Sequence, residues 1–100
     1  MTFNDLKFET HKSFPSSMSH ARIELPNGNG LSVVNGDFAY CDANTYEIAP
    51  LRDGSLFTVD DWCDQVHGYV TENQITEILQ HMENDTPEEY KDFLEGFFKG

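Results

Sequence analysis

Two cysteines and two histidines are the residues best suited by type to bind a metal ion. Cys63 and His67 are spaced i, i+4 and could share one helix face, and Cys41 and His81 would complete a four-ligand zinc set. The chain has no C-x-x-C pair, and the spacing 41…63…67…81 matches no standard zinc module. We therefore expect packed thiols and surface imidazoles, and we predict neither a metal ion nor another cofactor.

Three aspartates cluster in the segment DDWCD, residues 60–64. Paired carboxylates can bind Mg²⁺ or act as an acid and a base. The segment lacks the glycine and the closing glutamate of a calcium loop, and no Ser–His–Asp or Cys–His–Asn set can be argued from the scattered candidates. We expect Trp62 to be a core anchor, and we predict that the protein is not an enzyme. A small enzyme that uses residues 60–64 stays open as an alternative.

A G-x-G pair occurs in GNGLSV, residues 28–33. A dinucleotide-binding loop needs a third glycine and a following helix. Here a strand pattern follows, so the glycines predict a turn.

These residues must be positioned by one small domain, since the chain has 100 residues. Its content of 13% aromatic residues, with eight phenylalanines, is enough to build a core. No stretch approaches the roughly 18 apolar residues of a membrane span. The opening MTFNDLKFET lacks the basic region and apolar run of a secretory signal, so we expect reduced cysteines.

The negative charge is large and uneven. The net charge is −12, and residues 53–95 hold twelve acidic residues against one base, Lys91. Residues 1–52 hold six acidic residues and four basic ones. Such a field repels phosphates, so we predict no direct binding of nucleic acid or of membranes. It favours basic partners, including proteins that themselves hold nucleic acid, although net charge also serves solubility alone.

Residues 1–59 are predicted to be mainly β. Alternating apolar residues predict strands at 6–10, 20–25, 31–34, 45–51 and 56–59. PNGNG (26–30) predicts a turn that makes residues 20–34 a hairpin, and Asp53-Gly54 predicts a second hairpin. Pro50 cannot donate to a ladder, so we expect it at a sheet edge or a strand end.

Residues 60–100 are predicted to be mainly α and acidic. DWCDQVH is expected to form a short turn that ends at Gly68. Thr71 and Gln74 predict a capping box, and the apolar residues that follow share one helix stripe. Thr86 and Pro87 predict the start of a second helix. The expected architecture is α+β: an antiparallel meander of four to five strands packed with two to three C-terminal helices.

The second helix would be amphipathic. Tyr90, Phe93, Leu94, Phe97 and Phe98 recur at helical spacing and make one broad apolar face, which we expect to pack on the sheet. Glu88, Asp92 and Glu95 make an acidic stripe on the other side, with Glu89 beside it. Carboxylates on adjacent helix turns are about 5–6 Å apart, which is close to the spacing of phosphates along a nucleic-acid strand, so the stripe could imitate a phosphate ladder.

Three segments together resemble small, uncharacterised proteins of tailed bacteriophages and prophages. They are HARIELPNGNGLSVVNG, YEIAPLRDG and HGYVTENQITEIL, and the resemblance covers roughly residues 3 to 82. It implies a phage origin and a site of action in the cytoplasm of the infected bacterial host. The group has no established activity, so no functional residues carry over. By analogy, small acidic phage proteins without catalytic motifs are often inhibitors of host defence.

We therefore predict a phage-encoded anti-defence inhibitor, such as an anti-CRISPR protein, which binds a basic, nucleic-acid-handling host complex by mimicry or steric blocking. The expected contact residues are the carboxylates of the acidic half: Asp60, Asp61, Asp64, Glu83, Asp85, Glu88, Glu89, Asp92 and Glu95.

The alternative is a small accessory or structural phage protein that forms homodimers. Its expected contacts are the aromatic residues of the last helix: Tyr90, Phe93, Phe97 and Phe98.

Overall fold

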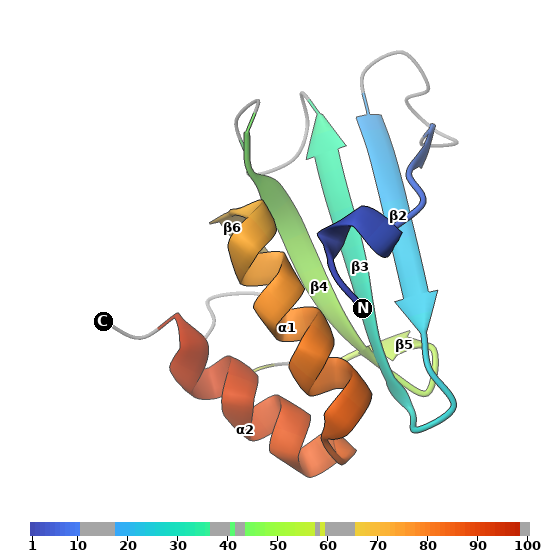
Figure 1. The fold of residues 1–100 in the computed structure, drawn as a ribbon, viewed down its shortest axis with the longest axis vertical. Coiled ribbons are helices and arrows are strands. Elements are labelled where there is room, and N and C mark those ends of the chain that lie inside the picture. Colours follow the sequence, from blue (N-terminus) through green and yellow to red (C-terminus); the bar gives the residue numbers. More distant parts are fainter. Residues whose placement is uncertain (11–17, 37–40, 42–43, 58, 60–65, 99–100) are drawn as a thin grey trace.

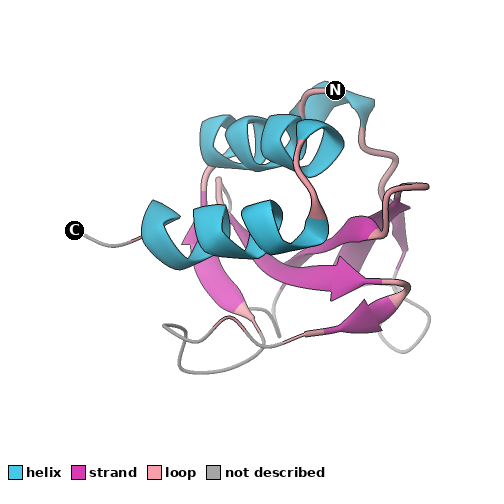
Figure 2. Cartoon of the chain, turned by 90° about the horizontal axis from the view of Figure 1, so that it is seen from below, coloured by secondary structure: helices cyan, strands magenta, loops and turns pink. Residues whose placement is uncertain are grey.

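An antiparallel sheet lies under two C-terminal helices in the computed structural model, which describes residues 1–10, 18–36, 41, 44–57, 59 and 66–98 (Figures 1 and 2). The predicted α+β class is confirmed. The sheet order is β1-β2-β3-β4-β5, and β6 also pairs with β4, along the same edge as β5. The elements are η1 (Phe3–Asp5), β1 (Glu9–Thr10), β2 (Met18–Glu24), β3 (Asn29–Gly36), β4 (Tyr46–Arg52), β5 (Ser55–Leu56), β6 (His67–Val70), α1 (Glu72–Asn84) and α2 (Pro87–Phe97).

The β2–β3 hairpin confirms the alternation seen in the sequence. Ala21 pairs with Val33 and both are buried, because every second residue of each strand faces the helices. The turn closes where the Gly28 amide donates to the Leu25 carbonyl at 3.0 Å. Gly28 then adopts a φ of 92°, which a residue without Cβ accepts most readily.

Strand β4 is shared by three neighbours, and this explains its proline. Pro50 lies inside β4, neither at a sheet edge nor at the strand end, and pairs in register with Leu31 of β3. Its carbonyl accepts from the Phe57 amide at 3.4 Å on the opposite side. The nitrogen of a strand residue points to the same side as its carbonyl, so the missing donor of Pro50 costs no bond to β3. The Pro50 nitrogen faces the other side of β4, between Ile48, which pairs with β6, and Leu51, which pairs with β5.

The hairpin at Asp53-Gly54 is confirmed. Both central residues have positive φ, 51° and 85°, which is the signature of a type I′ turn. Arg52 and Ser55 face each other across it.

Strand β6 corrects the predicted turn. Residues 60–65 lie outside the described part of the chain, but His67 and Gly68 belong to a strand that pairs with β4 and contains an irregularity. A four-residue strand with an internal glycine shows little alternation of apolar and polar residues, so the sequence does not predict β6. Tyr69 has a φ of 56° and is 63% exposed there, an uncommon conformation for a bulky residue.

The first predicted strand is also shorter than expected. Only Glu9–Thr10 pair with β2, and residues 6–8 belong to no strand; Phe3–Asp5, just before the predicted strand, form a single helical turn. Leu6 is nonetheless buried, as its place in an alternating pattern predicted.

Both helices begin where their caps predicted. The Thr71 hydroxyl accepts from the backbone amide of Gln74, and the Thr86 hydroxyl accepts from the backbone amide of Glu89, each at 3.2 Å. Both capping boxes are complete. The helices cover one face of the sheet and bury the predicted stripe: Ile75, Ile78, Leu79, Met82, Tyr90 and Leu94. No helix in the described ranges combines the length and the apolar character that crossing a membrane requires.

Candidate functional site

The acidic surface of the protein is concentrated on the two helices. Residues 72–97 hold eight carboxylates and one lysine. Along α2, Glu88, Glu89 and Asp92 are exposed while Tyr90 and Leu94 face the core. The stripe predicted from helical spacing is therefore present at Glu88 and Asp92, with Glu89 beside it, whereas its third predicted member, Glu95, is only partly exposed.

Part of this acidic surface is paired within the chain. Glu88 lies 3.3 Å from Arg52 Nη1, and Glu95 lies 3.7 Å from Lys91 Nζ. Glu83 lies 2.6 Å from the Met1 amine, whose pKa this hydrogen bond raises.

The remaining predicted contact residues differ in whether their carboxylates are already hydrogen-bonded within the chain. Glu89 accepts from the Thr86 amide in the capping box, so it holds the start of α2. The Asp92 side chain is exposed and makes no hydrogen bond or ion pair with the residues that the structure describes. Three predicted contact residues lie outside the described residues: Asp60, Asp61 and Asp64.

Arg52 joins the β4–β5 hairpin to the start of α2, which the sequence did not indicate. Its Nη2 donates to the Pro87 carbonyl at 3.0 Å, and its guanidinium lies 4.8 Å from the centre of the Phe57 ring. The charged pair with Glu88 thus forms part of a structural contact. Glu88 remains open to solvent all the same, with 78% of its side chain exposed.

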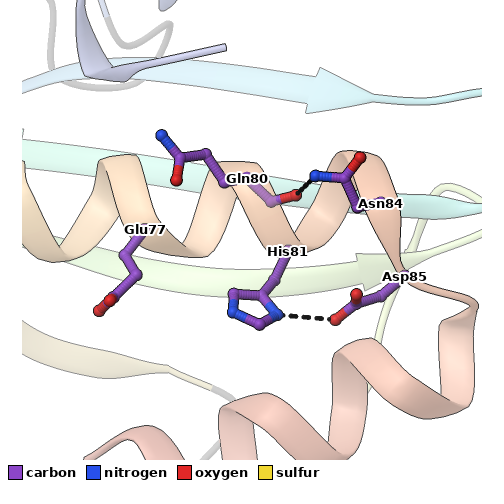
Figure 3. Close-up of a pocket in the computed structure, with 5 residues that line it drawn as sticks. All are labelled: Glu77, Gln80, His81, Asn84 and Asp85. Atoms are coloured by element: carbon purple, nitrogen blue, oxygen red, sulfur yellow. Dashed lines mark hydrogen bonds and ion pairs between the residues drawn. The ribbon is translucent and has the colours of Figure 1, made fainter.

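A polar groove follows α1 at the border with α2. We call it the α1 groove; it is about 270 Å³ in volume. Figure 3 shows His81 between two acidic side chains on the same side of the helix, with Glu77 one turn before it and Asp85 one turn after it. The residues that line the groove are Glu77, Gln80, His81, Asn84 and Asp85.

The imidazole in the α1 groove is held on two sides. His81 Nδ1 lies 2.9 Å from Asp85 Oδ2. The ring stacks on Phe93 of α2, with centroids 3.7 Å apart and planes 11° from parallel. The structure thus brings the predicted contact residue Asp85 together with a histidine that sequence reasoning had considered only as a metal ligand.

The chemistry of the α1 groove is that of hydrogen-bond acceptors. A histidine beside a carboxylate is one half of a nucleophile-activating arrangement, but none of the described residues that line this groove is Ser, Thr or Cys. In the described part of the chain, no group of three or more potential ligands could hold a metal ion. What the groove offers is two carboxylates, two amides and an imidazole.

The aromatic residues proposed for self-association face inward. Tyr90 is fully buried, and its hydroxyl donates to the Gly30 carbonyl at 3.0 Å, so it belongs to the core and not to a surface. Burial raises the pKa of Tyr90. Phe93 and Phe97 are half-buried and pack against the core within the same chain, with their rings 4.8 Å apart. The broad apolar face of α2 therefore packs on its own domain.

Two asparagines of the PNGNG turn bind the end of α1, and we call them the asparagine pair, Asn27 and Asn29. The buried Asn29 side chain donates to the Met82 and Asp85 carbonyls at 3.0 and 2.8 Å. Asn27 donates to the same two carbonyls at 2.9 and 3.3 Å. The last carbonyls of a helix lack intrahelical partners. These side-chain amides satisfy them, so the PNGNG turn has a structural role.

No protein-family model, curated protein or solved structure matched this chain. The resemblance to phage proteins accordingly stays a prediction. Function is best inferred from the acidic helix pair and the α1 groove.

Proposed function

We propose that the protein is a non-enzymatic, phage-encoded inhibitor that acts in the cytoplasm of the infected bacterium. It binds a basic, nucleic-acid-handling host complex, such as a CRISPR surveillance complex. The observation that carries this proposal is the exposed carboxylate stripe of α2 on a helix pair with eight carboxylates and one lysine. The phage origin rests on the sequence resemblance, and the choice of a defence complex rests on analogy.

The stripe has a spacing that suits a surface built for phosphates. Glu88 and Asp92 are one helical turn apart, which corresponds to roughly 5–6 Å. Lys and Arg side chains that hold a nucleic-acid backbone face a similar series of negative charges. The helix pair would occupy their channel and exclude the nucleic acid.

The ion pairs within the chain leave this surface able to bind. Exposed pairs such as Glu88–Arg52 contribute only about 0–1 kcal/mol, so a basic partner can compete for the carboxylate. Asp92 needs no such exchange. Charge complementarity would mainly raise the association rate and would make binding sensitive to salt.

The test compares charge reversals at matched exposed positions. Glu88→Lys with Asp92→Lys should weaken inhibition of a purified CRISPR surveillance complex by on the order of tenfold, or about 1.4 kcal/mol. Glu9→Lys is the control for Asp92→Lys alone, because each changes the net charge by two and Glu9 is exposed on β1 at the other edge of the sheet. Glu89 is left intact because it caps α2. The measurement is target-DNA binding by the complex against inhibitor concentration, at low and high salt.

Two results would contradict the proposal. One is equal inhibition by the double reversal and the wild type. The other is inhibition that does not change with salt, since an electrostatic interface must weaken as the Debye length shrinks.

A further inference from the structure

We propose that the α1 groove receives one arginine side chain of the basic partner. This inference rests on the proposed function, because it names the chemical group that the acidic surface recognises. The groove is separate from the α2 stripe of Glu88 and Asp92, and it is lined mainly by α1.

The composition of the lining selects a cationic hydrogen-bond donor. Glu77 and Asp85 supply carboxylate oxygens, and Gln80 and Asn84 carry amide oxygens. Among the described residues, no Lys or Arg and no apolar side chain lines the groove. An anion would meet two carboxylates there, and an apolar ligand would leave these acceptors unpaired. At about 270 Å³ the groove has room for a long side chain rather than for a folded element.

Glu77 is the open carboxylate of the groove. It is exposed and makes no hydrogen bond or ion pair with other described residues. Figure 3 shows its carboxylate on the same side of α1 as the imidazole of His81. An arginine that enters the groove can therefore pair with Glu77 without displacing an existing contact.

The opposite end of the groove is fixed in place. The Asp85 side chain lies against His81, and its backbone carbonyl accepts from both residues of the asparagine pair. A carboxylate that is already positioned loses little conformational entropy when a ligand binds. The site therefore combines one free and one preorganised carboxylate.

The flat ring between the two carboxylates favours arginine over lysine. His81 is held parallel to Phe93, and 42% of its side chain is exposed. A guanidinium is planar, stacks flat on aromatic faces and bonds carboxylates in a bidentate manner, whereas an ammonium is a compact point charge without this planar fork.

The experiment is an NMR titration of the full chain at low salt with a hexa-arginine peptide and, in parallel, with hexa-lysine. The side-chain amide signals of Gln80 and Asn84 report on the groove directly. In the wild type, hexa-arginine should shift both signals and bind about fivefold tighter than hexa-lysine. Glu77→Gln should weaken hexa-arginine binding about fivefold and remove this preference.

The matched control is Glu9→Gln. It removes the same charge from an exposed carboxylate on β1, outside the proposed binding surface, and should change hexa-arginine affinity less than about twofold. The amide spectrum of each variant shows whether the fold is retained.

The outcomes separate this inference from the proposed function. Equal weakening by Glu77→Gln and Glu9→Gln, or equal binding of the two peptides, would overturn the arginine site and leave the acidic surface standing. If neither peptide binds even at low salt, both proposals are wrong.

Discussion

Tyr90 connects a helix to the sheet through one buried hydroxyl. Its bond to the Gly30 carbonyl joins α2 to the middle of the sheet, and its ring meets Phe57 edge-on at 6.5 Å. Because burial disfavours the phenolate, the folded state holds the Tyr90 proton more tightly than the unfolded chain does.

Stability should therefore fall at alkaline pH. Above about pH 10 the tyrosine of the unfolded chain loses its proton while the folded protein keeps it, so the unfolded state binds fewer protons and the free energy of unfolding decreases. Tyr90→Phe should cost about 1 kcal/mol at neutral pH and show a smaller decline from pH 9 to 11.5. Urea unfolding across this range measures both effects. An unchanged pH profile in the variant would contradict this role.

Alanine substitutions at the two residues of the asparagine pair should lower the free energy of unfolding by unequal amounts. Asn29→Ala removes two buried hydrogen bonds and should destabilise the protein by about 1–3 kcal/mol, because Asn29 is only 1% exposed and water cannot replace its amide. Asn27→Ala should cost less than about 1 kcal/mol, since Asn27 is exposed and water can replace its amide. Urea midpoints of both variants give the comparison. Equal losses would show that burial does not set the value of these bonds.

At the scale of elements, two glycines in regular structure should respond in opposite directions to alanine. A Cβ at Gly96 of α2 would meet nothing within 4 Å, whereas one at Gly30 of β3 would lie 2.7 Å from the Ile23 carbonyl oxygen and 3.0 Å from Leu51 Cβ. Gly96→Ala should stabilise the protein by about 0.5–1 kcal/mol, because alanine loses less backbone entropy in a helix. Gly30→Ala should destabilise it by about 1–3 kcal/mol. Thermal unfolding of the two variants is the measurement, and a shift of equal sign in both would contradict the prediction.

Elements whose signals are local could be predicted from the sequence. Thr71 and Thr86 mark the helix starts because a cap bonds an amide only three residues away. Asp53-Gly54 marks a hairpin because two positive φ values are needed at adjacent positions. In each case the physical cause lies within a few residues.

Features that depend on distant partners could not be predicted in this way. Strand β6 is defined by its pairing with β4, and the asparagine pair bonds carbonyls more than fifty residues away. The α1 groove likewise needs Phe93 of α2 to orient His81 of α1. Of the candidate contact residues, the α2 stripe followed from helical periodicity, but the ion pair of Glu88 with Arg52 did not.

At the scale of the whole molecule, the net charge of −12 opposes folding through self-repulsion. Raising NaCl from about 0.01 to 0.5 M shortens the Debye length from about 30 Å to a few ångströms and should raise the urea midpoint. Asp92→Lys should itself stabilise the protein by a few tenths of a kcal/mol, because it replaces the repulsive i, i+4 pair with Glu88 by an attractive one.

The same variant should then be less responsive to salt in unfolding and weaker in binding the partner. Glu9→Lys again serves as the control, since it makes the same change of charge at the other edge of the sheet. If salt lowers the stability of the wild type, the ion pairs within the chain outweigh the self-repulsion.

The asparagine pair also has a kinetic consequence. Its four hydrogen bonds join positions 53 to 58 residues apart, so they form only after the chain has closed that long loop. Because closing that loop costs conformational entropy, we expect these bonds to form after the folding transition state, and such late contacts affect the unfolding rate and leave the folding rate almost unchanged. We therefore expect Asn29→Ala to raise the unfolding rate constant measured in a stopped-flow experiment. The two amides would then set how long the folded protein survives rather than how fast it forms.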